Sequence, residues 1–195
     1  IVVSTYQAVS GAGKEGIEEL ENQVKQYTAG EEMTANLLPT GSAPKHYPVA
    51  FNLLPQIDVF LDNDYTKEEM KMVHETQKIL HDDTIQVVPT TVRVPVYRSH
   101  SESVLVETEE PVSVEAFKAA CEKFPGLQVK DNPAEQIYPM PLYTSNQNDC
   151  EIGRIRKDLY NDKGMNFWIV GDQIRKGAAL NALQIAEYLV EKQAF

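Results

Sequence analysis

The sequence predicts an α+β fold in which a mixed β-sheet carries helices packed on one face. Runs rich in β-branched residues alternate with segments in which apolar residues recur at helical spacing. Strands that are neighbours in sequence are expected to pair as hairpins. The clearest case is Ile152–Leu159 with Met165–Gly171, around a turn that contains Asp162 and Gly164. The 195 residues have the length of one ordinary domain and can bury a real core.

The first third of the chain is predicted to contain one strand, one helix and long irregular stretches. In order, the segments are a strand over Ile1–Tyr6, a glycine turn over Ser10–Gly13, a helix over Lys14–Tyr27, a polar loop over Thr28–Pro48 and an apolar segment over Phe51–Phe60. The helix follows from the spacing of Ile17, Leu20 and Val24 along one face. Pro55 keeps the last segment from being a regular central strand.

A helix over Lys67–Leu80 has a clear start signal. Thr66 precedes it as an N-cap, and Glu69, three residues later, completes a capping box. Acidic residues in the first turn also favour the positive end of the helix dipole. We therefore expect Thr66 and Glu69 to fix the start of this helix.

The rest of the chain is predicted to contain two β-rich segments, a short helix, a loop, the hairpin described above and a closing helix. Apart from the hairpin, these are Ile85–Tyr97, Ser101–Thr108, a helix over Ser113–Phe124, a loop over Asp131–Asp149 and a helix over Gly177–Glu191. Ser113 is a suitable N-cap, and Phe117 and Cys121 lie on one face of the short helix.

Composition excludes several classes of function. A net charge of −11 argues against a nucleic-acid surface, because phosphate binding needs clustered Lys and Arg. No apolar run approaches the ~20 residues of a membrane span, and no leader pattern is present. Two cysteines make no disulfide framework, so a cytoplasmic protein is expected. The chain opens on "IVVSTYQAV" without Met, and we therefore expect the C-terminal part of a longer polypeptide.

Two residues in "TVRVPVYRSHSESV" are candidates for chemistry. His100 lies among serines after a β-rich segment, where a loop would present a proton-transfer group to a cleft; the alternative is a surface histidine. Arg93 lies in an apolar alternation and needs an anionic partner, because burying its charge unpaired is costly. That partner is either a structural Asp or Glu, or a substrate carboxylate that suits the guanidinium fork.

The other reactive side chains give weaker signals. Glu68 and Lys71 share a helix face, which by itself indicates an ordinary surface ion pair. His74 and His81 lack further ligands at metal-binding spacing, so no metal site is expected. Of the two cysteines, Cys121 falls on an apolar helix stripe, and Cys150 has acidic neighbours that disfavour a thiolate. Neither is expected to be a nucleophile.

Six segments in order resemble the C-terminal catalytic and dimerisation half of aspartate-β-semialdehyde dehydrogenases. They are "STYQAVSGAG", "FNLLPQIDVF", "EEMKMVHETQKIL", "VRVPVYRSHSESV", "IGRIRKDL" and "GAALNALQIAE". The pattern is most similar to the Gram-positive-type bacterial branch. The resemblance implies a fold like the C-terminal domain of glyceraldehyde-3-phosphate dehydrogenase, with residues 1–195 forming a substrate-binding and dimerisation domain. It also implies that the Rossmann NADP-binding domain and the Asn-Cys nucleophile lie upstream of this chain.

The resemblance implies a role for five side chains around the substrate. They are His100 as general acid/base, Arg93 for the substrate α-carboxylate, Glu68 for the amino group, Lys71 for phosphate and Gln7 for orienting the substrate. Adjacent Glu69 is the alternative to Glu68. Three further residues are implied to contact NADP: Ser10 and Gly11 near the nicotinamide ribose, and Gln173 at the nicotinamide carboxamide.

The implied reaction is the NADP-dependent reductive dephosphorylation of L-aspartyl-4-phosphate to L-aspartate-4-semialdehyde through a cysteine thioacyl intermediate. This step serves lysine, diaminopimelate, threonine and methionine biosynthesis. The resemblance implies self-association as a homodimer or homotetramer, and the 195 residues alone are expected to be inactive. Two alternatives stand beside this reading: an enzyme like N-acetyl-γ-glutamyl-phosphate reductase, and a non-catalytic dimerisation module.

Overall fold

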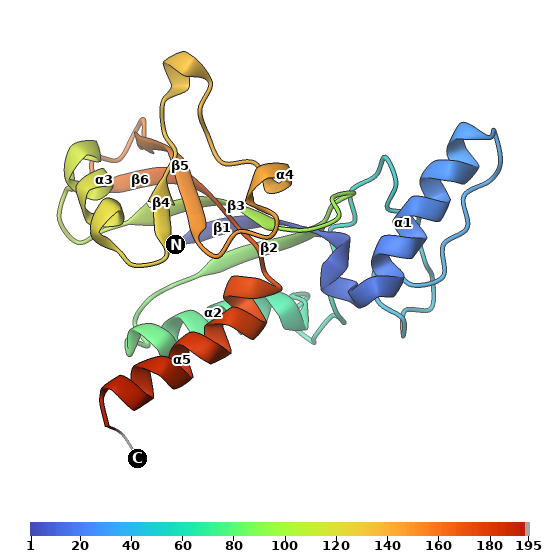
Figure 1. Cartoon of the computed structure of the whole chain (residues 1–195), viewed down its shortest axis with the longest axis horizontal. Helices are drawn as coiled ribbons and strands as arrows, with labels where there is room; N and C mark the ends of the chain where they lie inside the picture. Colours follow the sequence, from blue (N-terminus) through green and yellow to red (C-terminus); the bar gives the residue numbers. More distant parts are fainter. Residues whose placement is uncertain (194–195) are drawn as a thin grey trace.

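The structure, a computed structural model, describes residues 1–193 and contains one six-stranded mixed sheet in the order β2-β1-β3-β6-β5-β4 (Figure 1). The strands are β1 (Val2–Gln7), β2 (Val88–Arg93), β3 (His100–Glu107), β4 (Leu127–Val129), β5 (Cys150–Lys157) and β6 (Gly164–Gly171). β1 pairs with β2, and β4 with β5, in parallel, whereas the other neighbours are antiparallel. The α+β fold class with a mixed sheet is confirmed.

The helical elements are η1 (Val9–Ala12), α1 (Gly13–Thr28), α2 (Lys67–Leu80), α3 (Val114–Lys123), η2 (Pro133–Glu135), α4 (Pro141–Thr144), a π-helical turn η3 (Arg175–Ala179) and α5 (Leu180–Glu191). The four longer helices lie where the sequence predicted them, with small shifts in their bounds, whereas η2 and α4 lie in Asp131–Asp149, which was predicted to be a loop. The predicted glycine turn at Ser10–Gly13 is a 3-10 turn that runs directly into α1. No helix among residues 1–193 is long and apolar enough to cross a membrane.

Two expectations about the strands need correction. β2 and β3, neighbours in sequence, do not pair with each other, because β1 lies between them and bonds to both. His100, expected in the connecting loop, is the first residue of β3. The β5–β6 hairpin is confirmed, with a register shift between Gly153 and Arg156.

The start of α2 is tied to the sheet by Glu69. The Thr66 hydroxyl accepts from the Glu69 amide at 3.2 Å, and Glu69 Oε2 accepts from the Thr66 amide at 2.8 Å. Glu69 Oε1 accepts from the amide of Thr91 in β2 at 2.9 Å. The predicted capping box is therefore confirmed, and both oxygens of this buried carboxylate are occupied by backbone amides.

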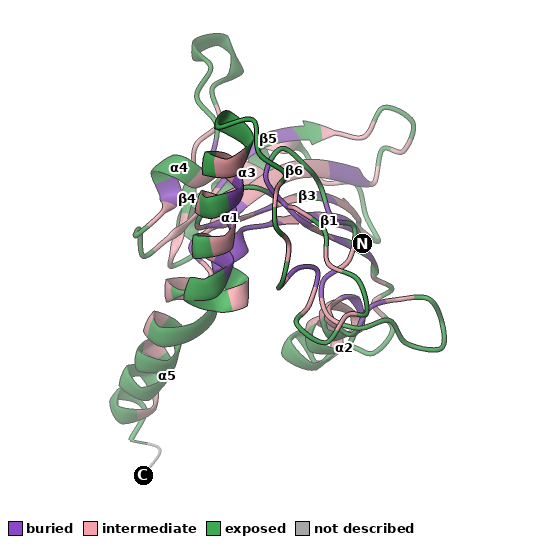
Figure 2. Ribbon diagram, turned by 90° about the vertical axis from the view of Figure 1, so that its right-hand side faces the viewer, coloured by how far each residue is buried: buried purple, intermediate pink, exposed green. Residues whose placement is uncertain are grey.

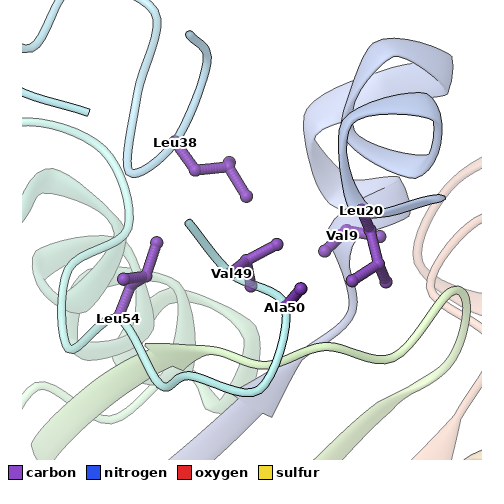
Figure 3. Close-up of a cluster of buried hydrophobic side chains, with 6 residues drawn as sticks. All are labelled: Val9, Leu20, Leu38, Val49, Ala50 and Leu54. Carbon is purple, nitrogen blue, oxygen red and sulfur yellow. The ribbon is translucent and has the colours of Figure 1, made fainter. Parts of the chain in front are cut away.

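A first apolar cluster fastens the long segment after α1 to the end of the sheet. It contains Val9, Leu20, Leu38, Val49, Ala50 and Leu54 (Figure 3). Gln23 of α1 is fully buried, and its Oε1 accepts from the amides of Val49 and Ala50 at 2.9 and 3.0 Å. Because these buried amides have no strand partner, the Gln23 side chain supplies the acceptor that they need.

A second cluster lies under α3 at the other end of the sheet. Cys121 of α3 packs with Ile152, Ile155 and Met165, and the ring of Phe117 stacks on that of Phe167 with centroids 5.5 Å apart. Buried residues lie in the sheet and in these two clusters, whereas α5 is almost entirely exposed (Figure 2). The exposed residues of α5 include Leu183, Ile185, Tyr188 and Val190.

Candidate active site

The sheet brings three strand ends together at a cavity of about 540 Å³. β1 ends at Gln7 opposite Arg93, the last residue of β2, and β3 begins beside them at His100. Seven of the eight predicted site residues line this cavity: Gln7, Gly11, Glu68, Lys71, Arg93, His100 and Gln173. The eighth, Ser10, contacts it indirectly by accepting a hydrogen bond from Gln173. A larger cavity along α1 contains none of these residues.

Arg93 is a buried cation without an acidic partner in the part of the chain that the structure describes. Its Nη1 donates to the carbonyl of Ala8 at 2.7 Å, and its buried Nε has no partner. No described carboxylate lies within ion-pair distance of the guanidinium. Burial lowers the pKa of Arg93, and the charge of Glu68 opposes that shift only in part. A guanidinium in this setting favours an anion that enters the cavity.

His100 is held as a neutral ring. Its Nδ1 accepts a hydrogen bond from the amide of Ala8 at 3.1 Å. Burial, together with the positive charge of Arg93, lowers the pKa of His100 to about 3, although Asp172 acts in the opposite direction. The unfolded chain takes up this proton below about pH 6.5, the ordinary value. His100 therefore favours the folded state fully above that pH, and the contribution falls as the pH drops toward 3.

Glu68 lies between an amide and an ammonium at the cavity wall. Gln7 Nε2 donates to Glu68 Oε1 at 3.4 Å, and Lys71 Nζ lies 3.1 Å from Glu68 Oε2. The hydrogen bond from Lys71 to Glu68 raises the pKa of that lysine. The cavity thus presents two cations, Lys71 and Arg93, and two carboxylates, Glu68 and Asp58.

Gly11 and Gln173 line the cavity beside Arg93 and His100. A Cβ on Gly11 would lie 2.7 Å from Arg93 Nη1 and 3.5 Å from His100 Cε1, so glycine leaves room for both side chains. Gln173 Nε2 donates to Ser10 Oγ at 2.6 Å, and Gln173 Oε1 accepts from the Ser99 amide at 3.1 Å. The Gln173 amide is therefore oriented by contacts on both of its ends.

Neither cysteine lines the Arg93 cavity. Cys121 packs in the α3 core, and burial raises the pKa of its thiol. Cys150 lies in a smaller cavity of about 250 Å³ that also borders His100, and burial likewise raises its pKa. Among residues 1–193, no three His, Cys, Asp or Glu side chains are grouped to hold a metal ion.

Comparison with known proteins identifies the family of this chain. The model of a family described as "Semialdehyde dehydrogenase, dimerisation domain" matches residues 1–176. The chain belongs to that family. Two similar proteins are the aspartate-semialdehyde dehydrogenases of Aquifex aeolicus, 50% identical over 192 residues, and of Bacillus subtilis, 47% identical over 190 residues. The alignments cover 98% and 97% of this semialdehyde dehydrogenase domain and 55% of each relative.

A solved structure shares the fold of this semialdehyde dehydrogenase domain. It is aspartate semialdehyde dehydrogenase II from Vibrio cholerae complexed with ASA, with a TM-score of 0.88 and 43% sequence identity. The match covers 97% of the domain and 54% of that chain. The domain therefore spans about half the length of the relatives that it matches.

The different surroundings of Glu68 and Glu69 lead to a prediction for this semialdehyde dehydrogenase domain. Glu69→Gln should lower the free energy of unfolding by about 2–3 kcal/mol, because a buried acceptor of backbone amides would become a donor at one position. Glu68→Gln should change stability by less than about 0.5 kcal/mol, because its ion pair with the half-exposed Lys71 is screened by solvent and Gln7 can still hydrogen-bond to the new amide. Urea unfolding of both variants measures the difference. Equal destabilisation would contradict the separate surroundings of the two carboxylates.

Proposed function

We propose that this domain supplies the substrate-binding and proton-transfer groups of an NADP-dependent aspartate-semialdehyde dehydrogenase. The reaction is the reductive dephosphorylation of L-aspartyl-4-phosphate to L-aspartate-4-semialdehyde. The observation that supports it most strongly is the buried Arg93, without an acidic partner among the described residues, in one cavity with His100 and Glu68. Such a cation is costly to bury unless an anionic ligand occupies the cavity.

The charges of the cavity suit an amino acid that carries a phosphate. Arg93 binds the α-carboxylate, because a planar guanidinium can donate two parallel hydrogen bonds to it. Glu68 accepts a hydrogen bond from the α-ammonium. The Glu68 carboxylate is itself held by Gln7, whose Nε2 donates to Glu68 Oε1 at 3.4 Å. Lys71, at the more exposed end of the cavity wall, binds the phosphate as a compact cation.

The nucleophile in this proposal comes from outside the 195 residues, because burial raises the pKa of both Cys121 and Cys150. A thiolate sulfur attacks the acyl carbon, and phosphate leaves with the electron pair of the broken C–O bond. NADPH would supply the hydride for reduction of the resulting thioester, and the C–S bond would break to release the aldehyde and return the thiolate. His100 acts through Nε2, the ring nitrogen that the Ala8 amide does not occupy, and its N–H donates to the oxygen on which negative charge develops.

The rim of the cavity fits the nicotinamide end of the cofactor. Ser10, Gly11 and Gln173 form a narrow polar edge beside His100, and the lack of a Cβ at Gly11 allows close approach. In this role the Gln173 amide, already oriented by Ser10 and Ser99, meets the carboxamide. The rest of the nucleotide is held by a Rossmann domain outside this chain.

The decisive experiment compares two acyl phosphates. The full-length protein should oxidise NADPH with L-aspartyl-4-phosphate and not with N-acetyl-γ-glutamyl phosphate. An acylated amine carries no positive charge with which the Glu68 carboxylate could pair. The 195 residues alone should show no turnover. Preference for the acetylated substrate would favour the reductase alternative. Inactivity of the full-length protein on both would favour a non-catalytic dimerisation module.

The proposal extends to assembly, lineage and location. The family description supports self-association, and we propose a homodimer or homotetramer, to be measured by analytical ultracentrifugation. The Gram-positive-type branch rests on the sequence segments alone, since the Aquifex and Bacillus relatives are similar to the chain to nearly the same degree. The proposed reaction places the protein in the cytoplasm.

A further inference from the structure

The ring of His100 has a defined tautomer. A backbone amide can only donate a hydrogen bond, and the Ala8 amide points at His100 Nδ1 from 3.1 Å. Nδ1 is therefore the nitrogen without a proton, and the neutral ring carries its hydrogen on Nε2. This arrangement holds only while the backbone of His100 stays in register with Ala8. The placement of His100 thus depends on the residue that precedes it.

That residue, Ser99, has an unusual backbone conformation. Its φ is +73°, in the left-handed region that residues with a Cβ rarely adopt, and it is almost fully buried. Such a conformation persists only where the surroundings hold it. Three contacts hold residues 98 and 99: Arg98 Nε to Asp172 at 2.7 Å, the Ser99 amide to Gln173 Oε1 at 3.1 Å, and the Ser99 and Ser145 hydroxyls at 3.2 Å.

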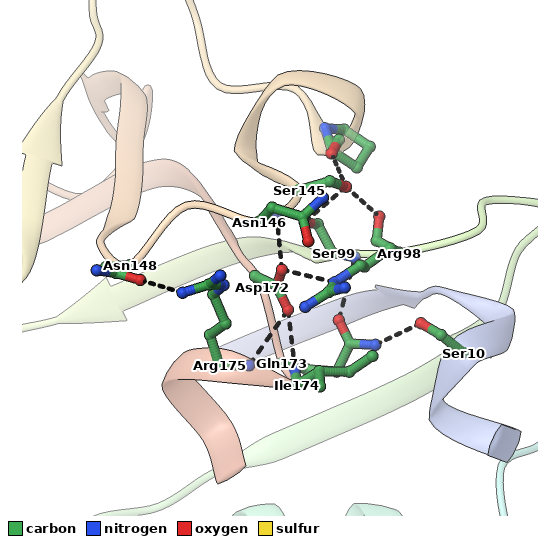
Figure 4. A network of polar contacts seen from close by, with 11 residues as sticks. Ser10, Arg98, Ser99, Ser145, Asn146, Asn148, Asp172, Gln173, Ile174 and Arg175 are labelled. Carbon is green, nitrogen blue, oxygen red and sulfur yellow. Dashed lines mark hydrogen bonds and ion pairs between the residues drawn. The ribbon is translucent and has the colours of Figure 1, made fainter. Parts of the chain in front are cut away.

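Asp172 contacts one of these partners directly and the neighbours of the other two (Figure 4). Its fully buried carboxylate pairs with Arg98 and accepts from the Asn146 amide at 2.7 Å, next to Ser145. It also accepts from the amides of Ile174 and Arg175 at 3.0 and 3.3 Å, which fixes the turn that contains Gln173. Asp172 directly follows Gly171, the residue opposite His100 in the β3–β6 ladder. One carboxylate therefore contacts Arg98 and both segments that hydrogen-bond to Ser99, Ser145–Asn146 and Gln173–Arg175.

We propose that Asp172 is a positioning residue for His100. Through Arg98, Ser145 and Gln173 it holds Ser99 in the left-handed conformation, and this keeps His100 Nδ1 on the Ala8 amide and Nε2 free for the cavity. Asp172 itself does not line the Arg93 cavity, although it lies with His100 in the neighbouring cavity of about 250 Å³. Its effect on catalysis, which rests on the proposed function, is exerted through the orientation and tautomer of His100.

The chain contains a matched control for this carboxylate. Asp131 is nearly as buried, pairs with Lys118 at 2.6 Å, and accepts from the amides of Arg154 and Ile155. Lys118 is exposed to nearly the same extent as Arg98. The Asp131 pair joins α3 to β5 and does not line the Arg93 cavity. Two pairs of variants therefore remove similar interactions in different places: Asp172→Asn with Asp131→Asn, and Arg98→Met with Lys118→Met.

The test reads the tautomer of His100 by ¹⁵N–¹H correlation of the imidazole nitrogens in the full-length protein, with His100→Asn to assign the signals. The unchanged protein should show one tautomer with the proton on Nε2. Asp172→Asn and Arg98→Met should give a mixture of tautomers. Both variants should lower kcat by about 10-fold or more, while KM for L-aspartyl-4-phosphate changes less than 3-fold. The two control variants should leave the His100 signals and kcat unchanged at equal folded fraction.

Each outcome bears on the proposal. His100 signals that stay unchanged in Asp172→Asn, or that change equally in Asp131→Asn, would overturn it. A proton on Nδ1 in the unchanged protein would also overturn it. If Asp172→Asn does not fold, Arg98→Met decides, because it leaves the amide contacts of Asp172 intact. The tautomer can be read without turnover, so failure of the proposed reaction would leave this test valid.

Discussion

Arg93→Lys should lower kcat/KM for the proposed aspartyl substrate by about 100- to 1000-fold, or about 3–4 kcal/mol. The lysine keeps the positive charge but loses the planar fork, and its ammonium cannot both replace the bond to the Ala8 carbonyl and hold a carboxylate in two places. Because the guanidinium has no ion pair among the described residues, the substitution breaks none, and the melting temperature should shift by only a few degrees. Steady-state kinetics and thermal unfolding measure the two effects.

The control for this variant is Arg156→Lys, at an exposed residue of β5 away from the cavity. It should leave kcat/KM within about 2-fold of the unchanged protein. If Arg93→Lys behaved like Arg156→Lys, Arg93 would not bind the substrate carboxylate, and the buried cation would need another explanation.

His100→Asn should lower kcat by about 100- to 10,000-fold while KM changes little. The Asn side chain places an oxygen near the position of Nδ1, so the Ala8 amide keeps an acceptor and the strand end keeps its register. What the variant removes is Nε2, the nitrogen that faces the cavity in the proposed reaction. The matched control is His74→Asn, on the exposed side of α2.

His100→Asn should also change how the free energy of unfolding depends on pH. The unchanged protein should lose folding free energy between about pH 6.5 and 3, because unfolding lets His100 take up a proton that the folded state excludes. His100→Asn removes that contribution, so the difference in unfolding free energy between pH 7 and pH 5 should be smaller than in the unchanged protein. An identical pH dependence would show that His100 is not buried as a neutral ring.

Local patterns predicted the local structure of this chain well. The capping box at Thr66 and Glu69 placed the start of α2 correctly, and the turn that contains Asp162 and Gly164 placed the β5–β6 hairpin. The capping box also contained the signal that distinguishes the two glutamates. A carboxylate committed to the helix N-terminus is not free for a ligand, which leaves Glu68 at the cavity.

Contacts between distant segments could not be predicted in the same way. Nothing near Ile1 indicates that β1 will lie between β2 and β3, because strand pairing is set by the whole sheet. The cavity residues were therefore found through family resemblance, and the structure shows that they lie together. Asp172 was missed, since an acidic residue after a strand is ordinary in sequence and only its four contacts distinguish it.

The central place of β1 also determines when the cavity can form during synthesis. β1 is made first, but its parallel neighbour β2 begins 86 positions later, and the antiparallel partner β3 ends at Glu107. Long-range parallel pairing closes a large loop and is slow. A nascent chain shorter than residue 88 therefore has both edges of β1 open, and the edge that pairs with β3 stays open until residue 107 is made. A ribosome that pauses in this interval would expose an incompletely paired apolar strand to chaperones and to aggregation.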